Sequence, residues 1–421
     1  MGIVKFSAVG LLSALAVSGG VAFAEMQDRP AGFKIGQRLT LKPYVSMEYT
    51  YDSNANQQND AESDSSWYIN PKLLAEYRGD NLKFDLGGFY GYRGYAKNVR
   101  NGSEHNYGEN LNLAWSNAGE NEKGWSILLT ERFQKVNAAD DIRSDNGNGL
   151  WRDRRDFQVD GVIQRRFNEN WHASINGGYY YLDYDNDAEG YAPLYGWQRL
   201  MAGLELGYAA SRWTDIILAA GYQSYTQDNS DDVLGRSYYT GSHDNYERES
   251  DGFTVQGGLQ TFATDRISYR ILAGWSRFEY AGESTDDGFT YSITADWKIS
   301  DTWTTMLLAQ SYYQPSERDY GSANRVDSVS WGLAHTMIRG KLNAVLDLAY
   351  RRETRQHTDV SSYDYDEDIF SARLGLDYTI NRYLAIYARG EYQGAFFDGD
   401  IEGAERDYNR FRLSVGFRLQ Y

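Results

Sequence analysis

The chain has 421 residues and contains no cysteine, so disulfide bonds cannot stabilise it even in an oxidising compartment outside the cytoplasm. Its formal net charge is −17 at pH 7, which argues against nucleic acid or anionic lipid headgroups as partners for the surface as a whole. Abundant aromatic residues (15%) together with only 5 prolines suit a protein of many β-strands.

Residues 1–24 have the pattern of a secretory signal peptide. Lys5 is the only charged residue, Phe6–Val17 is apolar or small, and Ala22–Ala24 fits a small-x-small cleavage site. The apolar run is too short for a membrane anchor, because spanning a bilayer takes about 20 residues. We therefore expect a cleaved signal peptide, followed by a short periplasmic leader at residues 25–36.

Residues 37–421 alternate between apolar and polar or small residues, in segments that recur about every 22 residues. Such alternation predicts strands with one apolar and one polar face. No apolar run here is long enough for a membrane helix and the mean hydropathy is −0.65, so a membrane-spanning form must be a closed barrel. The eighteen predicted strands lie near 37–52, 66–78, 82–97, 104–116, 124–137, 153–167, 171–185, 196–209, 213–227, 250–263, 267–281, 287–299, 303–314, 324–338, 341–353, 367–380, 383–397 and 407–421.

The connections between these segments alternate between short and long. Eight short turns and nine long loops make the seventeen connections that eighteen antiparallel strands require. Outer-membrane barrels place short turns and both termini in the periplasm and long loops outside. The sequence therefore predicts an all-β fold, a single transmembrane antiparallel up-and-down β-barrel of about 18 strands over residues 37–421. Its short turns would be periplasmic, and its long acidic loops, such as Asp228–Glu249, would be extracellular.

Tryptophan placement supports this orientation. Aromatic belts form where a barrel meets the lipid headgroups, because the indole ring is apolar while its N–H seeks water. Six tryptophans near the short turns predict such a girdle at the periplasmic end. They are Trp115, Trp125, Trp171, Trp213, Trp297 and Trp303.

If the apolar alternates face lipid, the polar alternates face the lumen, and these carry charges of both signs. An eighteen-stranded barrel is wide enough for an aqueous channel. The alternative is that the charges pair across strands and fill the interior for stability. Inward aromatics such as Tyr180, Phe278 and Tyr387 could stack on sugar faces, or could bridge loop and wall. The lumen-lining candidates are Lys72, Glu76, Lys83, Asp85, Arg93, Arg132, Arg199, Glu205, Arg270, Asp347, Arg373, Asp377, Arg389, Glu391, Arg412 and Arg418.

The last strand alternates strictly and ends on an aromatic residue. This pattern resembles the recognition signal of bacterial outer-membrane barrels. The strand would close the barrel by pairing with the first one near Leu39–Tyr51. The apolar residues of the predicted assembly signal are Phe411, Leu413, Val415, Phe417, Leu419 and Tyr421.

Catalytic and metal-binding patterns have little support. The five histidines show no HxxxH spacing and no nucleophile elbow accompanies them, so we expect no enzyme. The acidic stretch Asp183–Glu189 briefly imitates the start of an EF-hand, but Ala188 replaces the required glycine and Leu194 the final glutamate. We therefore predict no metal site and no cofactor.

The end of the first predicted strand carries a short motif, Tyr49–Asn56, with the pattern aromatic-x-Tyr-Asp-Ser-Asn. It resembles the second putative β-barrel porin family of Gram-negative bacteria, several members of which are encoded with exopolysaccharide or capsule secretion machinery. The resemblance implies a barrel that passes polymer or solutes across the outer membrane. We expect Asp52 and Asn54 to shape the first outer turn, because these residue types favour turns.

The sequence thus predicts an outer-membrane pore for a hydrophilic solute or polymer, with exopolysaccharide or saccharide export as the leading function. A general diffusion porin is the first alternative and would need an inward-folded loop, for which Asp228–Glu249 is the long candidate. A non-transporting barrel acting as adhesin or structural receptor is the second. The expected partners are outer-membrane lipid, lipopolysaccharide, the barrel assembly machinery and periplasmic polysaccharide export proteins, without nucleic acid.

Overall fold

The computed structural model describes residues 32–55, 61–97, 105–117, 123–137, 153–184, 196–227, 248–280, 284–315, 323–355, 365–399 and 407–421. The predicted signal peptide, residues 25–31 of the leader and residues 228–247 of the longest loop lie outside these ranges. Within the ranges, no helix is long and apolar enough to cross a membrane.

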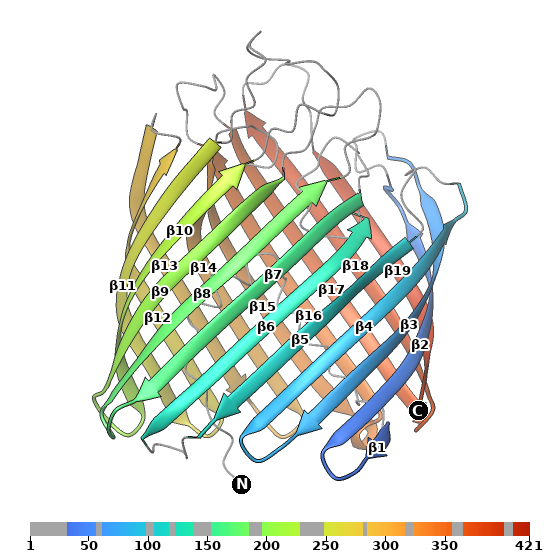
Figure 1. Cartoon of the computed structure of the whole chain (residues 1–421). Helices are drawn as coiled ribbons and strands as arrows, with labels where there is room; N and C mark the ends of the chain where they lie inside the picture. Colours follow the sequence, from blue (N-terminus) through green and yellow to red (C-terminus); the bar gives the residue numbers. More distant parts are fainter. Residues whose placement is uncertain are drawn as a thin grey trace.

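Tilted antiparallel strands close into one barrel, with β1 and the C-terminal residue at the same rim (Figure 1). Each strand pairs with its sequence neighbours, and β19 returns to β2. The wall strands are β2 (Leu39–Asp52), β3 (Asp64–Arg78), β4 (Leu82–Tyr95), β5 (His105–Ser116), β6 (Gly124–Asn137), β7 (Asp153–Arg166), β8 (Trp171–Tyr184), β9 (Trp197–Ala209), β10 (Thr214–Gln227), β11 (Arg248–Thr264), β12 (Ile267–Tyr280), β13 (Ser284–Lys298), β14 (Trp303–Pro315), β15 (Ala323–Met337), β16 (Leu342–Arg355), β17 (Tyr365–Asn381), β18 (Leu384–Gly399) and β19 (Tyr408–Gln420).

The eighteen predicted strands are confirmed, and so is the antiparallel barrel. The largest boundary difference is three residues, at the start of β13, which was predicted at 287 and begins at Ser284. Two elements were not predicted. The short strand β1 (Phe33–Ile35) lies within the predicted leader and pairs with Leu39–Leu41, and a 3-10 turn (Ile338–Gly340) joins β15 to β16.

The outer face of the wall is apolar and the inner face is polar. On β9, for example, Leu200 and Leu204 are 59% and 60% exposed, whereas Arg199 and Glu205 are each only 6% exposed. This pattern is the reverse of a water-soluble protein, and a continuous exposed apolar band is the surface that lipid covers.

The girdle tryptophans lie as this orientation requires. Trp125, Trp171, Trp213 and Trp297 are between 40% and 49% exposed, close to the short turns. These turns are at the rim that carries β1 and the C-terminal residue (Figure 1).

The barrel closes where β19 pairs with β2, from Gln420 opposite Tyr44 to Arg412 opposite Asp52. Just beyond this ladder, the backbone N–H of Gly32 donates to the carbonyl of Tyr421 at 2.7 Å. The ring of Phe33 stacks on Tyr421, with centroids 4.1 Å apart. The chain's terminal aromatic residue is therefore held by the strand that precedes the barrel.

Deleting Tyr421 is expected to lower the yield of folded barrel in the outer membrane, because the predicted assembly signal loses its terminal aromatic ring. Conductance of the molecules that do fold should be unchanged. Heat-modifiable migration of the membrane fraction measures the folded yield. The matched variant Phe33→Ala removes only the stacking contact, worth about 0.5–1.5 kcal/mol, and should assemble nearly normally. A wild-type yield from the deletion would contradict the assembly role.

Candidate functional site

A row of charged residues crosses the inner wall from β16 to β3. Its members stand directly opposite one another on successive strands, so they share one face of the sheet. Their signs alternate until the last pair, where two carboxylates meet. In strand order, this charged row consists of Asp347, Arg373, Glu391, Arg412, Asp52 and Asp64.

Glu391 is the centre of this charged row. Its carboxylate lies 2.7 Å from the guanidinium of Arg412 and 3.7 Å from that of Arg373. The side chains of Glu391 and Arg412 are each 13% exposed, whereas Arg373 is 41% exposed and presents its charge to the lumen. One carboxylate therefore neutralises two arginines on neighbouring strands.

Asp52, in the tyrosine-aspartate-serine-asparagine motif, fastens the barrel seam. Both of its carboxylate oxygens accept from Arg410, at 2.6–3.1 Å, and both side chains are almost fully buried. Asp52 also accepts from the backbone N–H of Asn54, as expected for a turn-forming residue. The amide of Asn54 in turn donates to the carbonyl of Asn409. The motif thus ties the first wall strand to the last, a role that its sequence did not reveal.

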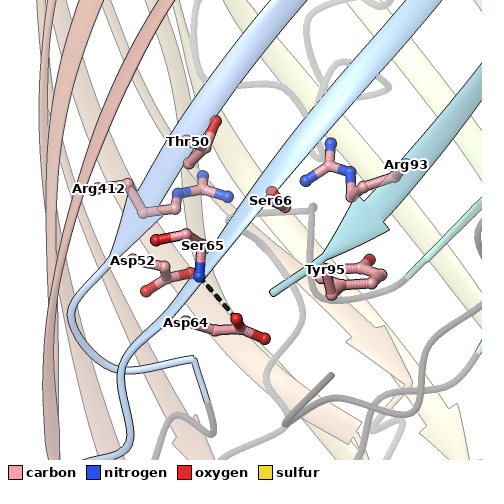
Figure 2. Close-up of a pocket in the computed structure, with 8 residues that line it drawn as sticks. All are labelled: Thr50, Asp52, Asp64, Ser65, Ser66, Arg93, Tyr95 and Arg412. Carbon is pink, nitrogen blue, oxygen red and sulfur yellow. Dashed lines mark hydrogen bonds between the residues drawn. The ribbon is translucent and has the colours of Figure 1, made fainter. Parts of the chain in front are cut away.

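A small pocket lies beside this seam. Figure 2 shows its lining side chains on β2, β3, β4 and β19, with Asp52, Asp64 and Arg412 close together. Asp64, the first residue of β3, accepts hydrogen bonds from the backbone N–H groups of Ser65 and Lys97. These bonds fix the position of its carboxylate. The pocket is polar and lined by charges of both signs.

The other predicted lumen-lining residues also lie on the inner face. On each strand they alternate with the exposed apolar residues, which face outward. Most of them have a partner there. The contacts are Glu76 with Lys42 and Arg78, Asp85 with Arg78, Lys72 over the rings of Tyr44 and Phe89, Arg93 over Tyr68, Arg132 with Asp156, Arg270 with Glu205, Arg389 with Glu48, and Arg418 with Asp377. Lys83 stands opposite Arg78 near the periplasmic turn. Direct contact between these residues and a passing solute stays a prediction.

The opposite part of the inner wall carries an aromatic cluster, formed by Tyr180, Trp197, Tyr225, Phe278 and Tyr313. Successive ring centroids are 4.8, 5.6, 5.5 and 6.2 Å apart. The guanidinium of the predicted lumen residue Arg199 lies over three of these rings, at 5.7–5.8 Å. All five rings are at least 92% buried, so they pack on one another rather than lining open water.

Sequence reasoning missed several of these residues. Trp197 and Tyr225 have inward parity, so their positions on β9 and β10 could have revealed them. Tyr313 gave no such signal, because it has the parity of outward residues on β14. Within the described ranges, no group of three or more His, Asp or Glu side chains could hold a metal ion.

Removing one partner of the buried seam pair should destabilise the barrel strongly. Asp52→Ala or Arg410→Ala removes one partner of this buried ion pair, which typically costs about 3–5 kcal/mol of unfolding free energy. The double variant should lose less than either single variant, because both charges of the buried pair are removed together. Urea unfolding in lipid vesicles measures the change.

The matched control is Asp80→Ala, which breaks the exposed Arg38–Asp80 pair at the periplasmic rim. Solvent already screens this pair, so its loss should have little effect. An equally small effect of Asp52→Ala would contradict the role of the seam pair.

Comparison with solved structures identifies outer-membrane barrels. The siderophore receptor PirA from Acinetobacter baumannii is 10% identical, with a TM-score of 0.47, covering 92% of this chain and 81% of PirA. The outer membrane protein OpdK from Pseudomonas aeruginosa is 13% identical, with a TM-score of 0.42, covering 90% of this chain and 99% of OpdK. The FrpB iron transporter from Neisseria meningitidis is 9% identical, with a TM-score of 0.45, covering 92% of this chain and 82% of FrpB.

A search of curated protein sequences finds no significant match. The family model described as putative beta-barrel porin 2, in contrast, matches residues 29–421, which include every described strand. This match agrees with the barrel, its apolar outer band and its polar inner wall, and it supports an outer-membrane pore. The chain belongs to the putative beta-barrel porin 2 family.

Proposed function

We propose that this barrel passes a hydrophilic saccharide or polymer across the outer membrane, in the direction of exopolysaccharide export. The observation that carries the proposal is the pairing of opposite charges along the inner wall. Arg270 and Glu205 meet at 2.5 Å, for instance, and Arg418 meets Asp377 at 3.2 Å. Paired charges leave many hydrogen-bonding groups but no dominant sign, which suits a neutral, hydroxyl-rich solute better than a selected ion.

The remaining parts of the proposal follow from the predicted signals. Residues 1–24 would direct export and be cleaved, and the terminal strand would engage the barrel assembly machinery. The acidic outer loops would face lipopolysaccharide. Polymer export would require periplasmic export proteins at the rim that carries the short turns. Genes for such proteins, or for glycosyltransferases, next to this one would support that version, and their absence would count against it.

A general diffusion porin is the second candidate, and one observation favours it. Such a porin needs an inward constriction, and the outer end of β14 supports one, because Tyr313 contacts Phe278 on β12 and Tyr225 on β10. The loop expected to form it, Asp228–Glu249, lies outside the described residues apart from its last two positions. Saccharide discrimination separates the two candidates, because a diffusion porin passes small solutes by size alone.

Planar-bilayer recording of the purified barrel tests the pore directly. We expect discrete channels with weak ion selectivity, and current noise when a neutral oligosaccharide enters the lumen. Oligosaccharides and polyethylene glycols of equal size provide the comparison. No channel events from folded protein would contradict transport and favour the non-transporting alternative. Equal effects of both polymers would favour the diffusion porin.

Neutralising the centre of the charged row should shift ion selectivity. Glu391→Gln leaves Arg373 and Arg412 without their shared carboxylate, so the lumen gains net positive charge and should prefer anions. The reversal potential in a KCl gradient should move toward that of chloride. Asp80→Asn, on an exposed periplasmic turn, is the control and should leave it nearly unchanged. An unchanged potential in Glu391→Gln would show that the charged row does not border the ion path.

A further inference from the structure

Among the described wall strands, β13 and β14 share the shortest ladder. β13 pairs with β14 only from Ser292 opposite Gln310 to Lys298 opposite Thr304. Both strands continue outward beyond this short ladder, and β14 stays paired with β15 as far as Pro315. The outer halves of β13 and β14 therefore separate, although the strands on either side remain fully paired.

Beyond this point β14 lies inside the barrel. The hydroxyl of Tyr225, on the inner face of β10, donates to the carbonyl of Tyr313 at 3.5 Å. Three strands separate β10 from β14 in the wall, and neighbouring strands are about 4.8 Å apart, so a side chain could not reach around the circumference. The contact requires the outer end of β14 to cross the lumen side of the intervening strands.

The burial pattern along β14 changes phase at the same place. Leu308 and Gln310 are buried on the inner face, and the next buried residues are Ser311 and Tyr313, which have the opposite parity. The outward-directed face of β14 is thus covered from residue 311 onward. What covers it is the inner face of the wall, because Tyr313 stacks on Phe278 of β12.

Two further contacts hold this overlap on β13. A Cβ atom at Gly288 would lie 2.9 Å from the hydroxyl of Tyr313, so the absence of a side chain there makes room for the ring. Arg325, opposite Tyr313 on β15, donates to the backbone carbonyl of Phe289 at 3.4 Å. That carbonyl belongs to the stretch of β13 that has no ladder to β14.

The sequence of β14 also suits a fully paired wall. Continuing the existing register outward would set Phe289 opposite Tyr313, three pairs beyond the last observed pair of Ser292 and Gln310. Phe289 faces outward and is 53% exposed, close to the equally exposed Trp275 on β12. In that arrangement Tyr313 would join an outer aromatic belt, where its ring and hydroxyl are both accommodated.

We propose that the outer end of β14–β15 is a gate of the pore, closed in this structure by the packing of Tyr313 into the aromatic cluster. In the open state β14 pairs with β13 along its outer half, Tyr313 leaves Phe278 for the outer surface, and the lumen widens. The closed state has the packing of Tyr313 on Phe278, and the open state has additional backbone pairing between β13 and β14. Neither state requires a broken strand. The gate presupposes the proposed pore.

An engineered disulfide tests the open state, and the absence of native cysteine makes the readout specific. In Phe289→Cys with Tyr313→Cys, the two thiols face each other only when β14 pairs with β13. We expect the disulfide to form on oxidation, single-channel conductance to rise, and reductant to reverse both. The matched pair Ala295→Cys with Leu307→Cys lies six residues along the same ladder, already paired. It should cross-link without changing conductance.

A second comparison needs no cross-link. Tyr313→Ala removes the ring from the aromatic cluster and should increase conductance, whereas Tyr313→Phe keeps the ring and should conduct as the wild type does. Heat-modifiable migration confirms that each variant is folded.

Two outcomes would overturn the gate: a cross-link that forms only in the control pair, or one that forms at 289 and 313 without altering conductance. Channels that respond to neither variant would refute the gate and leave the pore standing. No channels in any protein, wild type included, would refute the pore and the gate together.

Discussion

The constraint on which this structure depends is the pairing of backbone groups in lipid. Hydrocarbon offers no hydrogen-bond partner, and each unpaired N–H or C=O group there costs several kcal/mol. A sheet that spans the membrane must therefore have no free edge, and here β19 and β2 remove it by pairing over Tyr44–Asp52. The buried Asp52–Arg410 pair lies at the outer end of that seam, where the ladder stops and the two strands would otherwise separate. The tyrosine-aspartate-serine-asparagine motif at the end of β2 is thus part of barrel closure.

The same constraint explains where the wall can be incomplete. β13 and β14 part only in their outer halves, while their periplasmic halves keep the ladder. The overlap places β14 over the inner face of β13, so the carbonyl of Phe289 finds Arg325 instead of a strand. The packing of Tyr313 on Phe278 stabilises this overlap, where β13 and β14 share no ladder. In the proposed gate, pairing of these outer halves would turn the overlap into a continuous ladder and widen the lumen.

Much of this fold could be predicted because period-2 alternation and loop length are local properties of the sequence. Strands such as β6 and β19 were located within a residue or two, and parity alone placed Glu391 and Arg412 on the inner face. Parity does not give partners, because the pairs often lie two residues off the direct register, as Arg410 does from Asp52. Alternation also could not reveal the role of Tyr313, because Tyr313 occupies a position on β14 that alternation assigns to the lipid-facing side. Only tertiary packing on Phe278 decides its position.

The strand β1 has a consequence for the order of events during biogenesis. Phe33 lies flat on the ring of Tyr421, and Gly32 binds its carbonyl, so the end of the last strand is occupied by a segment from the beginning of the chain. A membrane factor that recognises this aromatic end must do so before β1 docks. Docking in turn needs β2 already in place beside β19, because β1 is held by β2. These contacts of Gly32 and Phe33 with Tyr421 therefore need a closed cylinder, and under the predicted assembly signal they would cover its aromatic end after closure.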